Sequence, residues 1–362
     1  MNQGETLYIE GRLEEARAAL RKEAKEGDGR ALYCLGQYEL FGLWETRERP
    51  AEAAALFRRG AASDAPARLM SALFLREDAV DVEAVRRALA EAEQAADAGD
   101  VNALYALSAV LWDGVGTVVE KEEDKARAYC EKAAALGFWQ AEMEMGLHYL
   151  NGTRLPQDEA KGAAFLKRAA EKGVGKAEYH MAYCCLAGVG TEKNPSLAVS
   201  YYQKALRHGY LRAAVELGVY YETGTYVKQD KKKAYQLYRR AAEAGDADGK
   251  AHLADCLLAG EAVKRNARQA AALYAEAAKS GSAYAVLRMG ETAFSGGDEG
   301  TAFRYFLDAA RMGLPAAQYL AGMCLLQGRG VAPDRQAAAL WLRRAAQRGS
   351  REASALLMQA GL

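Results

Sequence analysis

Two helical patterns of apolar and polar positions alternate along the chain, and together they return about every 36 residues. Each period opens with an Ala at the head of an apolar stripe: Ala31, Ala67, Ala103, Ala141, Ala177, Ala213, Ala251, Ala285 and Ala317, with Ala353 beginning a tenth. Self-similarity at such a period is typical of stacked helical hairpins. The pattern therefore predicts nine helix pairs, and it makes recurring segments such as YRRAAEAG (238–245) architectural, since a catalytic motif normally occurs once.

Small residues recur at one place in the first helix of each pair. Five residues after the opening Ala stand Gly36, Ala72, Ser108, Gly146, Ala182, Gly218, Cys256, Gly290 and Gly322. Glycine inside a helix costs about 1 kcal/mol relative to alanine, so its recurrence indicates close approach of another helix. The second helix has its own small residue, such as Ala234, and in most periods a bulky one three positions later: Leu56, Tyr129, Phe165, Tyr201, Leu237, Leu273, Tyr305 and Trp341. We expect these bulky side chains to interlock with the small positions.

Glycines also mark the connections. Each pair tends to end in Ala-Ala followed by a Gly, as at Gly245, which suits the left-handed residue that terminates a helix. Gly-rich segments such as AGVGTEKNPS (187–196) join the two helices of a pair. We interpret them as turns, because a phosphate-binding loop follows a strand and no strand-like alternation precedes them. Two periods depart from the pattern: the second lacks its Gly-rich turn, and Asp64 stands where the first should have its closing Gly.

These features resemble the Sel1-like repeat, a relative of the tetratricopeptide repeat. The match is fullest in residues 317–349, at Ala317, Gly322, Gly328, Gly330, Val331, Asp334, Ala345, Ala346 and Gly349. The resemblance implies an all-α fold, a right-handed superhelical α-solenoid of stacked antiparallel helix pairs, whereas composition and spacing alone indicate only an α-solenoid. It also implies a scaffold for protein–protein contact, a role common in bacterial regulatory and host-interaction systems. We expect 1–29 to form a capping half-repeat, 30–352 nine Sel1-like repeats, and 353–362 a truncated C-terminal helix.

Composition narrows the class of partner. The chain has 48 Lys and Arg against 48 Asp and Glu, and this balance argues against wholesale nucleic-acid binding. The N-terminus has no secretory-signal pattern, and no apolar run approaches the roughly 18 residues that a membrane span needs. The six cysteines form no regular pairing. We therefore expect a reduced, cytoplasmic protein that does not bind membranes.

Candidate chemistry is sparse. The four histidines form no HExxH or Cys-x-x-Cys…His pattern, and the best local pair is His180 with Cys184, one helical turn apart. Two ligands do not make a structural zinc site, so we expect no metal, no cofactor and no catalytic residue. The basic run KQDKKK (228–233) is interpreted as a solvated helix start in preference to an anion site.

The sharpest functional candidate is a surface. By analogy to tetratricopeptide repeats, residues two, six and nine after the opening Ala line the concave side. The predicted partner-binding residues are Tyr33, Tyr105, Trp112, Met143, Leu147, Tyr179, Tyr183, Phe294 and Tyr319, and the same rows include Leu253, Leu257 and Met323. Tyr105, Trp112, Met143, Tyr179 and Tyr183 form the predicted main groove. The alternative is that a tight superhelix buries these residues against neighbouring repeats.

The sequence thus predicts a non-enzymatic scaffold or adaptor that binds a partner protein or peptide on its concave face. One alternative is a self-assembling structural solenoid, with weak self-association through the C-terminal repeat face. A less favoured alternative is a metal-dependent or Cys/His enzyme that uses His180 and Cys184.

Overall fold

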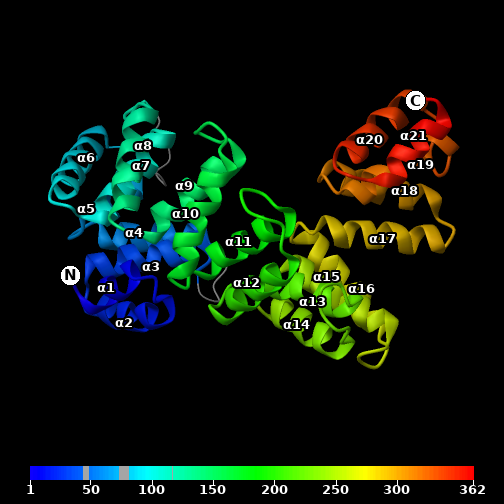
Figure 1. The fold of residues 1–362 in the computed structure, drawn as a ribbon, viewed down its shortest axis with the longest axis horizontal. Coiled ribbons are helices and arrows are strands. Elements are labelled where there is room, and N and C mark those ends of the chain that lie inside the picture. Colours follow the sequence, from blue (N-terminus) through cyan, green and yellow to red (C-terminus); the bar gives the residue numbers. More distant parts are fainter. Residues whose placement is uncertain (44–48, 73–80, 116) are drawn as a thin grey trace. The chain divides into compact units, whose positions relative to one another are not determined.

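The computed structural model describes residues 1–43, 49–72, 81–115 and 117–362. Within these ranges all regular secondary structure is α-helical, apart from an isolated antiparallel bridge between Val115 and Val119. Figure 1 shows the helices as successive hairpins along the chain. The predicted all-α solenoid of stacked helix pairs is confirmed. The altered turn expected in the second repeat falls on 73–80, outside the described residues.

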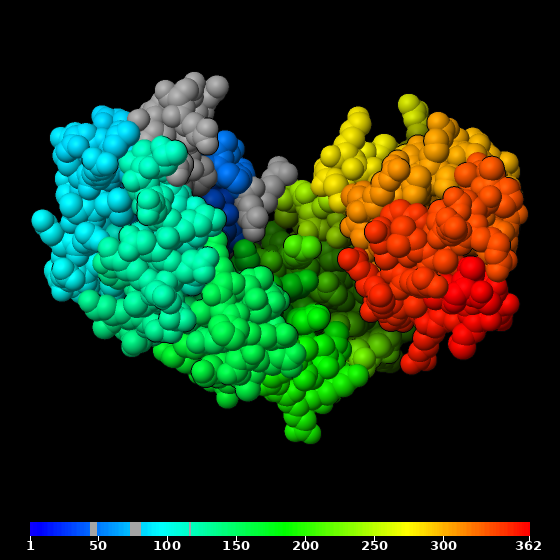
Figure 2. Space-filling view, turned by 90° about the horizontal axis from the view of Figure 1, so that it is seen from above, coloured from blue at the N-terminus to red at the C-terminus, as the bar shows by residue number. Residues whose placement is uncertain are grey.

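The helices group into two compact units, residues 1–217 and 218–362, and the boundary falls inside α13 (Ala213–Thr223). The first unit contains α1 (Gln3–Ile9), α2 (Leu13–Lys25), α3 (Gly29–Phe41), α4 (Pro50–Gly60), α5 (Ala65–Ala72), α6 (Val82–Asp97), α7 (Val101–Asp113), α8 (Glu123–Ala135), α9 (Trp139–Asn151), α10 (Glu159–Glu171), α11 (Gly175–Ala187) and α12 (Pro195–Arg207). The second contains α14 (Lys231–Glu243), α15 (Ala247–Ala259), α16 (Ala267–Lys279), α17 (Ala283–Ser295), α18 (Glu299–Arg311), α19 (Pro315–Gln327), α20 (Arg335–Gln347) and α21 (Arg351–Ala360). In Figure 2 each unit appears as adjoining bands of colour that follow the sequence, as expected for repeats that contact mainly their neighbours.

Where the small position of a first helix is a glycine, it faces the second helix of the same pair, in line with the predicted close approach of another helix. A Cβ on Gly146 would lie 2.8 Å from Leu166, and one on Gly322 would lie 2.7 Å from Leu342. The expected bulky partner was wrong by one residue, however. The side chain that packs on the small position of the first helix comes four positions after the small residue of the second helix, and it is buried. The residues three positions after, such as Phe165 and Trp341, are only partly buried. The reason is geometric, because a helix has about 3.6 residues per turn, so a residue four positions on lies closer to the same face than a residue three positions on.

The helix ends follow the predicted turn chemistry. Gly245 has φ 86°, and the glycines at the same place in the other pairs, from Gly99 to Gly349, are also left-handed. The glycine missing from the first pair leaves a different turn, and Asp64 lies at the start of α5, where its carboxylate accepts a hydrogen bond from the Ala67 amide at 2.9 Å. The second glycine of the Gly-x-Gly turns is also structural. A Cβ on Gly190 would overlap the carbonyl of Glu159 in the preceding pair, so this turn packs against protein backbone.

Candidate protein-binding site

The predicted groove is filled in the first four repeats. Tyr33, Tyr105, Trp112 and Met143 are all buried, so they offer no free surface to a partner. Tyr105 packs edge-on against Phe138, with ring centroids 5.6 Å apart. The expectation that these residues line an open groove is therefore corrected, and at these positions the packing alternative describes the structure.

Helix α1 is the element that closes this region. The Tyr8 ring is fully buried, and its centroid lies 5.7 Å from that of Tyr38 and 5.6 Å from that of Trp139. The Trp139 indole Nε1 donates to the Tyr8 carbonyl at 2.8 Å. The chain's own N-terminal helix thus contacts repeats that are more than a hundred residues apart in sequence.

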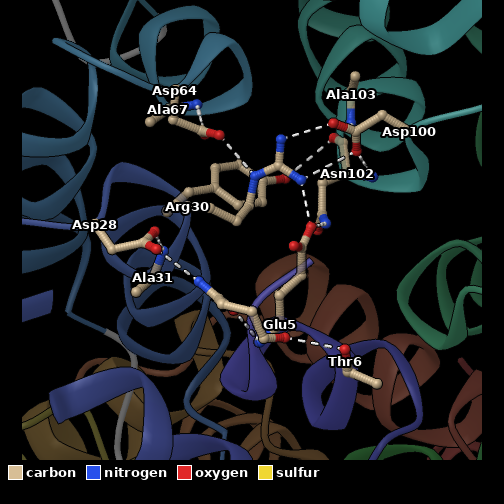
Figure 3. A network of polar contacts seen from close by, with 12 residues as sticks. Glu5, Thr6, Asp28, Arg30, Ala31, Asp64, Ala67, Asp100, Asn102 and Ala103 are labelled. Carbon is tan, nitrogen blue, oxygen red and sulfur yellow. Dashed lines mark hydrogen bonds and ion pairs between the residues drawn. The ribbon is translucent and has the colours of Figure 1, made fainter. Parts of the chain in front are cut away.

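A polar network at the start of the first helices anchors the same region (Figure 3). Asp64 and Asp100 each accept a hydrogen bond from the Arg30 guanidinium at 2.6 Å, and Glu5 of α1 accepts a third. The Asn102 side-chain amide donates to Glu5 at 3.0 Å. Burial raises the pKa of Glu5 and of Asp64, and Arg30 opposes this rise. Sequence reasoning missed this network, although Asp28, Asp64 and Asp100 recur at intervals of 36 residues.

Accessible residues on the predicted face begin at α9 and α11. Leu147 and Tyr179 are partly buried, whereas Tyr183, one helical turn after Tyr179, is 54% exposed. The Tyr179 hydroxyl donates to Glu216 at 3.2 Å, and its ring packs against Tyr202 at 5.3 Å between centroids. Tyr179 therefore supports the surface that Tyr183 presents.

His180 on the same helix is held neutral. Burial lowers its pKa to about 4, and the charges of Lys176 and Arg212 act in the same direction. Its predicted partner Cys184 is buried, and burial raises the pKa of that thiol to about 11. Across the described ranges no group of three or more His, Cys, Asp or Glu side chains is placed to hold a metal ion. All six cysteines are buried and unpaired.

In the second unit a pocket of about 350 Å³ opens between α17 and α19, with α18 beneath it. Phe294, Phe306, Leu320 and Met323 supply apolar walls, and Phe294 and Met323 belong to the predicted rows. The Arg329 guanidinium lies 4.2 Å from the centroid of the Phe294 ring. Tyr319 behaves differently, because it packs on the cluster of Leu342, Ala345 and Ala353 at the last hairpin.

A polar hub fixes one edge of this pocket. Asp255 accepts hydrogen bonds from the hydroxyls of Tyr274 at 2.5 Å and Tyr284 at 2.7 Å, and from Arg288 Nε at 2.8 Å. Arg288 also pairs with Glu291, which lines the pocket beside it. The guanidinium is therefore held in place by several contacts, and the pocket combines apolar walls with a positioned ion pair.

The basic run 228–233 behaves as a helix start. The Asp230 carboxylate caps α14 by accepting from the Lys233 amide at 2.9 Å. Lys231 pairs with Glu261, and the Lys233 ammonium lies 4.0 Å from the centroid of the Tyr221 ring. Two of its lysines are thus engaged by neighbouring side chains.

Stacked helix pairs that contact mainly their neighbours define a repeat solenoid. The Sel1 repeat model matches residues 101–138, 139–174, 175–210, 211–246, 247–282, 283–314 and 315–350, and the chain belongs to the Sel1 repeat family. Proteins of this family are generally interaction scaffolds, and the fold is generally not catalytic. The first two predicted repeats lie outside the matched segments and stay a prediction.

Solved structures agree with this assignment. A protective antigen of uropathogenic Escherichia coli that displays an SLR fold is 27% identical, with a TM-score of 0.58, and the match covers 93% of this chain and 73% of that one. A Sel1 repeat protein from Oxalobacter formigenes is 26% identical, with a TM-score of 0.51, and the match covers 84% of this chain and 89% of that one. No curated protein matches the sequence. Within the described residues, none of the helices has both the length and the apolar character needed to span a membrane.

Proposed function

We propose that the chain is a non-enzymatic scaffold that binds a segment of a partner protein on the exposed faces of its first helices. The observation that carries this proposal is the pocket between α17 and α19, where Phe294, Leu320 and Met323 surround space for an apolar side chain. A pocket with apolar walls and a few positioned polar groups is what an anchor residue of a partner requires. Tyr183 offers a second contact on α11.

The proposed contact residues are fewer than the predicted ones. Within the first unit they are Leu147, Tyr179 and Tyr183. Within the second unit the pocket keeps Phe294 and adds Leu320. Tyr33, Tyr105, Trp112 and Met143 are left out because they are buried. Tyr319 supports the last hairpin.

The test is a selection of peptides from a random twelve-residue library on the intact protein, followed by fluorescence anisotropy with a selected peptide. Leu320→Glu with Met323→Glu should weaken binding about thirtyfold, because the loss of a buried anchor costs about 2 kcal/mol. Leu340→Glu is the matched control, since Leu340 is 50% exposed on α20 and lies outside the pocket. Selection of no peptide, or equal binding by both variants, would contradict the proposal.

A second pair of variants tests the α11 face. Tyr183→Ala should reduce the binding of any selected peptide that contacts this face, whereas Leu197→Ala, a 43% exposed residue of α12, should not. Both side chains are exposed, so neither substitution should alter the fold.

We also propose that the protein works in the cytoplasm. Its six thiols are buried and unpaired, which suits a reducing compartment. Self-association through the C-terminal face stays a prediction. A substitution at Met358 of α21, which is 78% exposed, would test it.

A further inference from the structure

A second groove lies on the opposite helix layer of the second unit. It runs between α14 and α16, two second helices, and its floor is the first helix α15 between them. Its volume is about 680 Å³. Leu253 and Leu257 of α15 form the floor but are only 8% and 5% exposed, so the reachable apolar surface comes from Leu273 of α16 and Val263 of the adjoining loop, which are partly buried. Leu253 and Leu257 were predicted to lie on the concave rows, but the structure buries them beneath this groove.

One edge of this groove is a loop held at both ends. Helix α15 ends at Gly260, which is left-handed with φ 72°. The Asn266 amide donates to the Leu257 carbonyl at 2.9 Å, and the Asn266 side chain accepts from the Gln269 amide at 3.1 Å. The loop 261–266 is therefore tied to both helices that it joins, and it presents Lys264 and Arg265 to the groove.

The charges around the groove are unbalanced. Its lining has four cations and two carboxylates, and both carboxylates are already paired: Arg239 with Glu243 at 3.4 Å and Lys250 with Glu276 at 3.0 Å. Neither Lys264 nor Arg265 has an ion-pair partner among the residues that the structure describes, and both are exposed. The net charge of residues 218–362 is also positive, with 20 Lys and Arg against 14 Asp and Glu. Residues 1–217 have a negative net charge, with 28 Lys and Arg against 34 Asp and Glu.

We propose that this groove binds an acidic segment of a partner protein, which places an apolar side chain on Leu273 and Val263 and carboxylates beside Lys264 and Arg265. The contact with Leu273 and Val263 supplies affinity through burial. The two unpaired cations supply attraction and orientation, since complementary charge speeds encounter and fixes register. The groove is separate from the pocket between α17 and α19, so the two proposals stand or fall independently.

The probe is a fluorescein-labelled twelve-residue peptide with one leucine among glutamates and aspartates, measured by anisotropy with the full chain. We compare it with a version that has serine in place of leucine and a version that has lysines in place of the acids. The acidic leucine peptide should bind at least about tenfold more tightly than either, and its binding should weaken as salt is raised.

Lys264→Glu with Arg265→Glu should reduce binding of the acidic leucine peptide by at least about tenfold. Arg268→Glu with Arg343→Glu makes the same change in charge at exposed positions outside the groove and should leave binding within about twofold. Both pairs are exposed, so circular dichroism should show unchanged helicity. If both double variants lost the same amount of peptide binding, the effect would be one of net charge alone, and the proposal would be overturned.

Three further results would also overturn it. The first is serine-peptide binding as tight as leucine-peptide binding, because the apolar contact with Leu273 and Val263 would then play no part. The second is binding of a twelve-nucleotide oligothymidylate as tight as that of the acidic peptide and equally dependent on Lys264 and Arg265, which would make the groove a general anion site. Light scattering over a concentration series that shows self-association lost in the Lys264 and Arg265 variant would assign the groove to a second copy of the chain instead.

Discussion

His180 shows how burial sets the charge of a single residue. Its ring lies edge-on to Tyr179, with centroids 5.6 Å apart, and its surroundings disfavour the charged form because water is excluded and two cations are near. The imidazole therefore stays neutral down to a pH of about 4, whereas in the unfolded chain it takes up a proton near its ordinary pKa of 6.5.

This difference predicts a pH-dependent stability. The folded pKa of His180 is below the unfolded value, so the unfolded state binds more protons between pH 6.5 and pH 4, and stability falls as the pH falls through this window. Between pH 7 and pH 5 the wild type should lose about 2 kcal/mol more than His180→Gln in urea unfolding. Parallel pH profiles for the two proteins would show that His180 does not carry this effect.

Helix pairs lock together where a small residue of the first helix meets a ring or a leucine of the second. Gly218 of α13 faces Tyr238 of α14, and that ring is fully buried. The ring also stacks on His252 at 4.8 Å between centroids, and its hydroxyl donates to Glu222 at 2.7 Å. Because the ring is held on both sides, it cannot move away from an added methyl group.

Gly218→Ala should therefore destabilise the protein, in spite of the better helix propensity of alanine. We expect a loss of about 1–3 kcal/mol in the free energy of unfolding, which is usual for overpacking. Gly300→Ala in α18 is the matched control, because the nearest atoms to its Cβ are 3.9 Å away or more, and it should be neutral or stabilising by up to about 1 kcal/mol. A neutral Gly218→Ala would mean that the two helices can separate at no cost.

The first unit is organised around one side chain. Arg30 of α3 connects α1, the start of α5 and the start of α7 through Glu5, Asp64 and Asp100. In a solenoid each pair contacts mainly its neighbours, so we expect this network to couple distant pairs of the first unit in a way that stacking alone does not. The same elements bring Tyr8 under Trp139.

Arg30→Met should lower the stability of residues 1–217 by about 3 kcal/mol, because three carboxylates lose a partner in a region of low exposure. Hydrogen exchange should show lost protection in α1, α3, α5 and α7, with protection of 218–362 retained. Arg12→Met, which removes an exposed pair with Glu15, is the control.

The loss of stability caused by Arg30→Met should become smaller as the pH is lowered and Glu5 and Asp64 take up protons. The pKa values of Glu5 and Asp64 are raised by burial, so protonation favours the folded state, and the neutral carboxyls no longer need the guanidinium. A defect of constant size from pH 7 to pH 4, or exchange that spreads over both units, would contradict this account.

The period of small and apolar residues was enough to predict the helix pairs, the left-handed glycine at each joint and the close approach at positions such as Gly146 and Gly322. These features depend on contacts between residues that are near in sequence, within one hairpin or between adjacent hairpins. They can therefore be predicted from local spacing, and their repetition along the chain makes the prediction stronger. The sequence could not show that Leu166 and not Phe165 is the interlocking residue, because both are apolar and they are adjacent in the helix.

Which of the aromatic residues stay accessible was decided by tertiary structure alone. Tyr105 and Tyr179 occupy the same place in their repeats, yet the first is buried and the second, with Tyr183 beside it, lies at an accessible face. The difference arises from α1, whose Glu5 reaches Asn102 and whose Tyr8 reaches Trp139, across 97 and 131 residues. No repeat encodes such contacts, because they join residues of non-adjacent helix pairs within the first unit. The sequence by itself determines the repeating unit, whereas these long-range contacts determine which of its aromatic residues stay accessible.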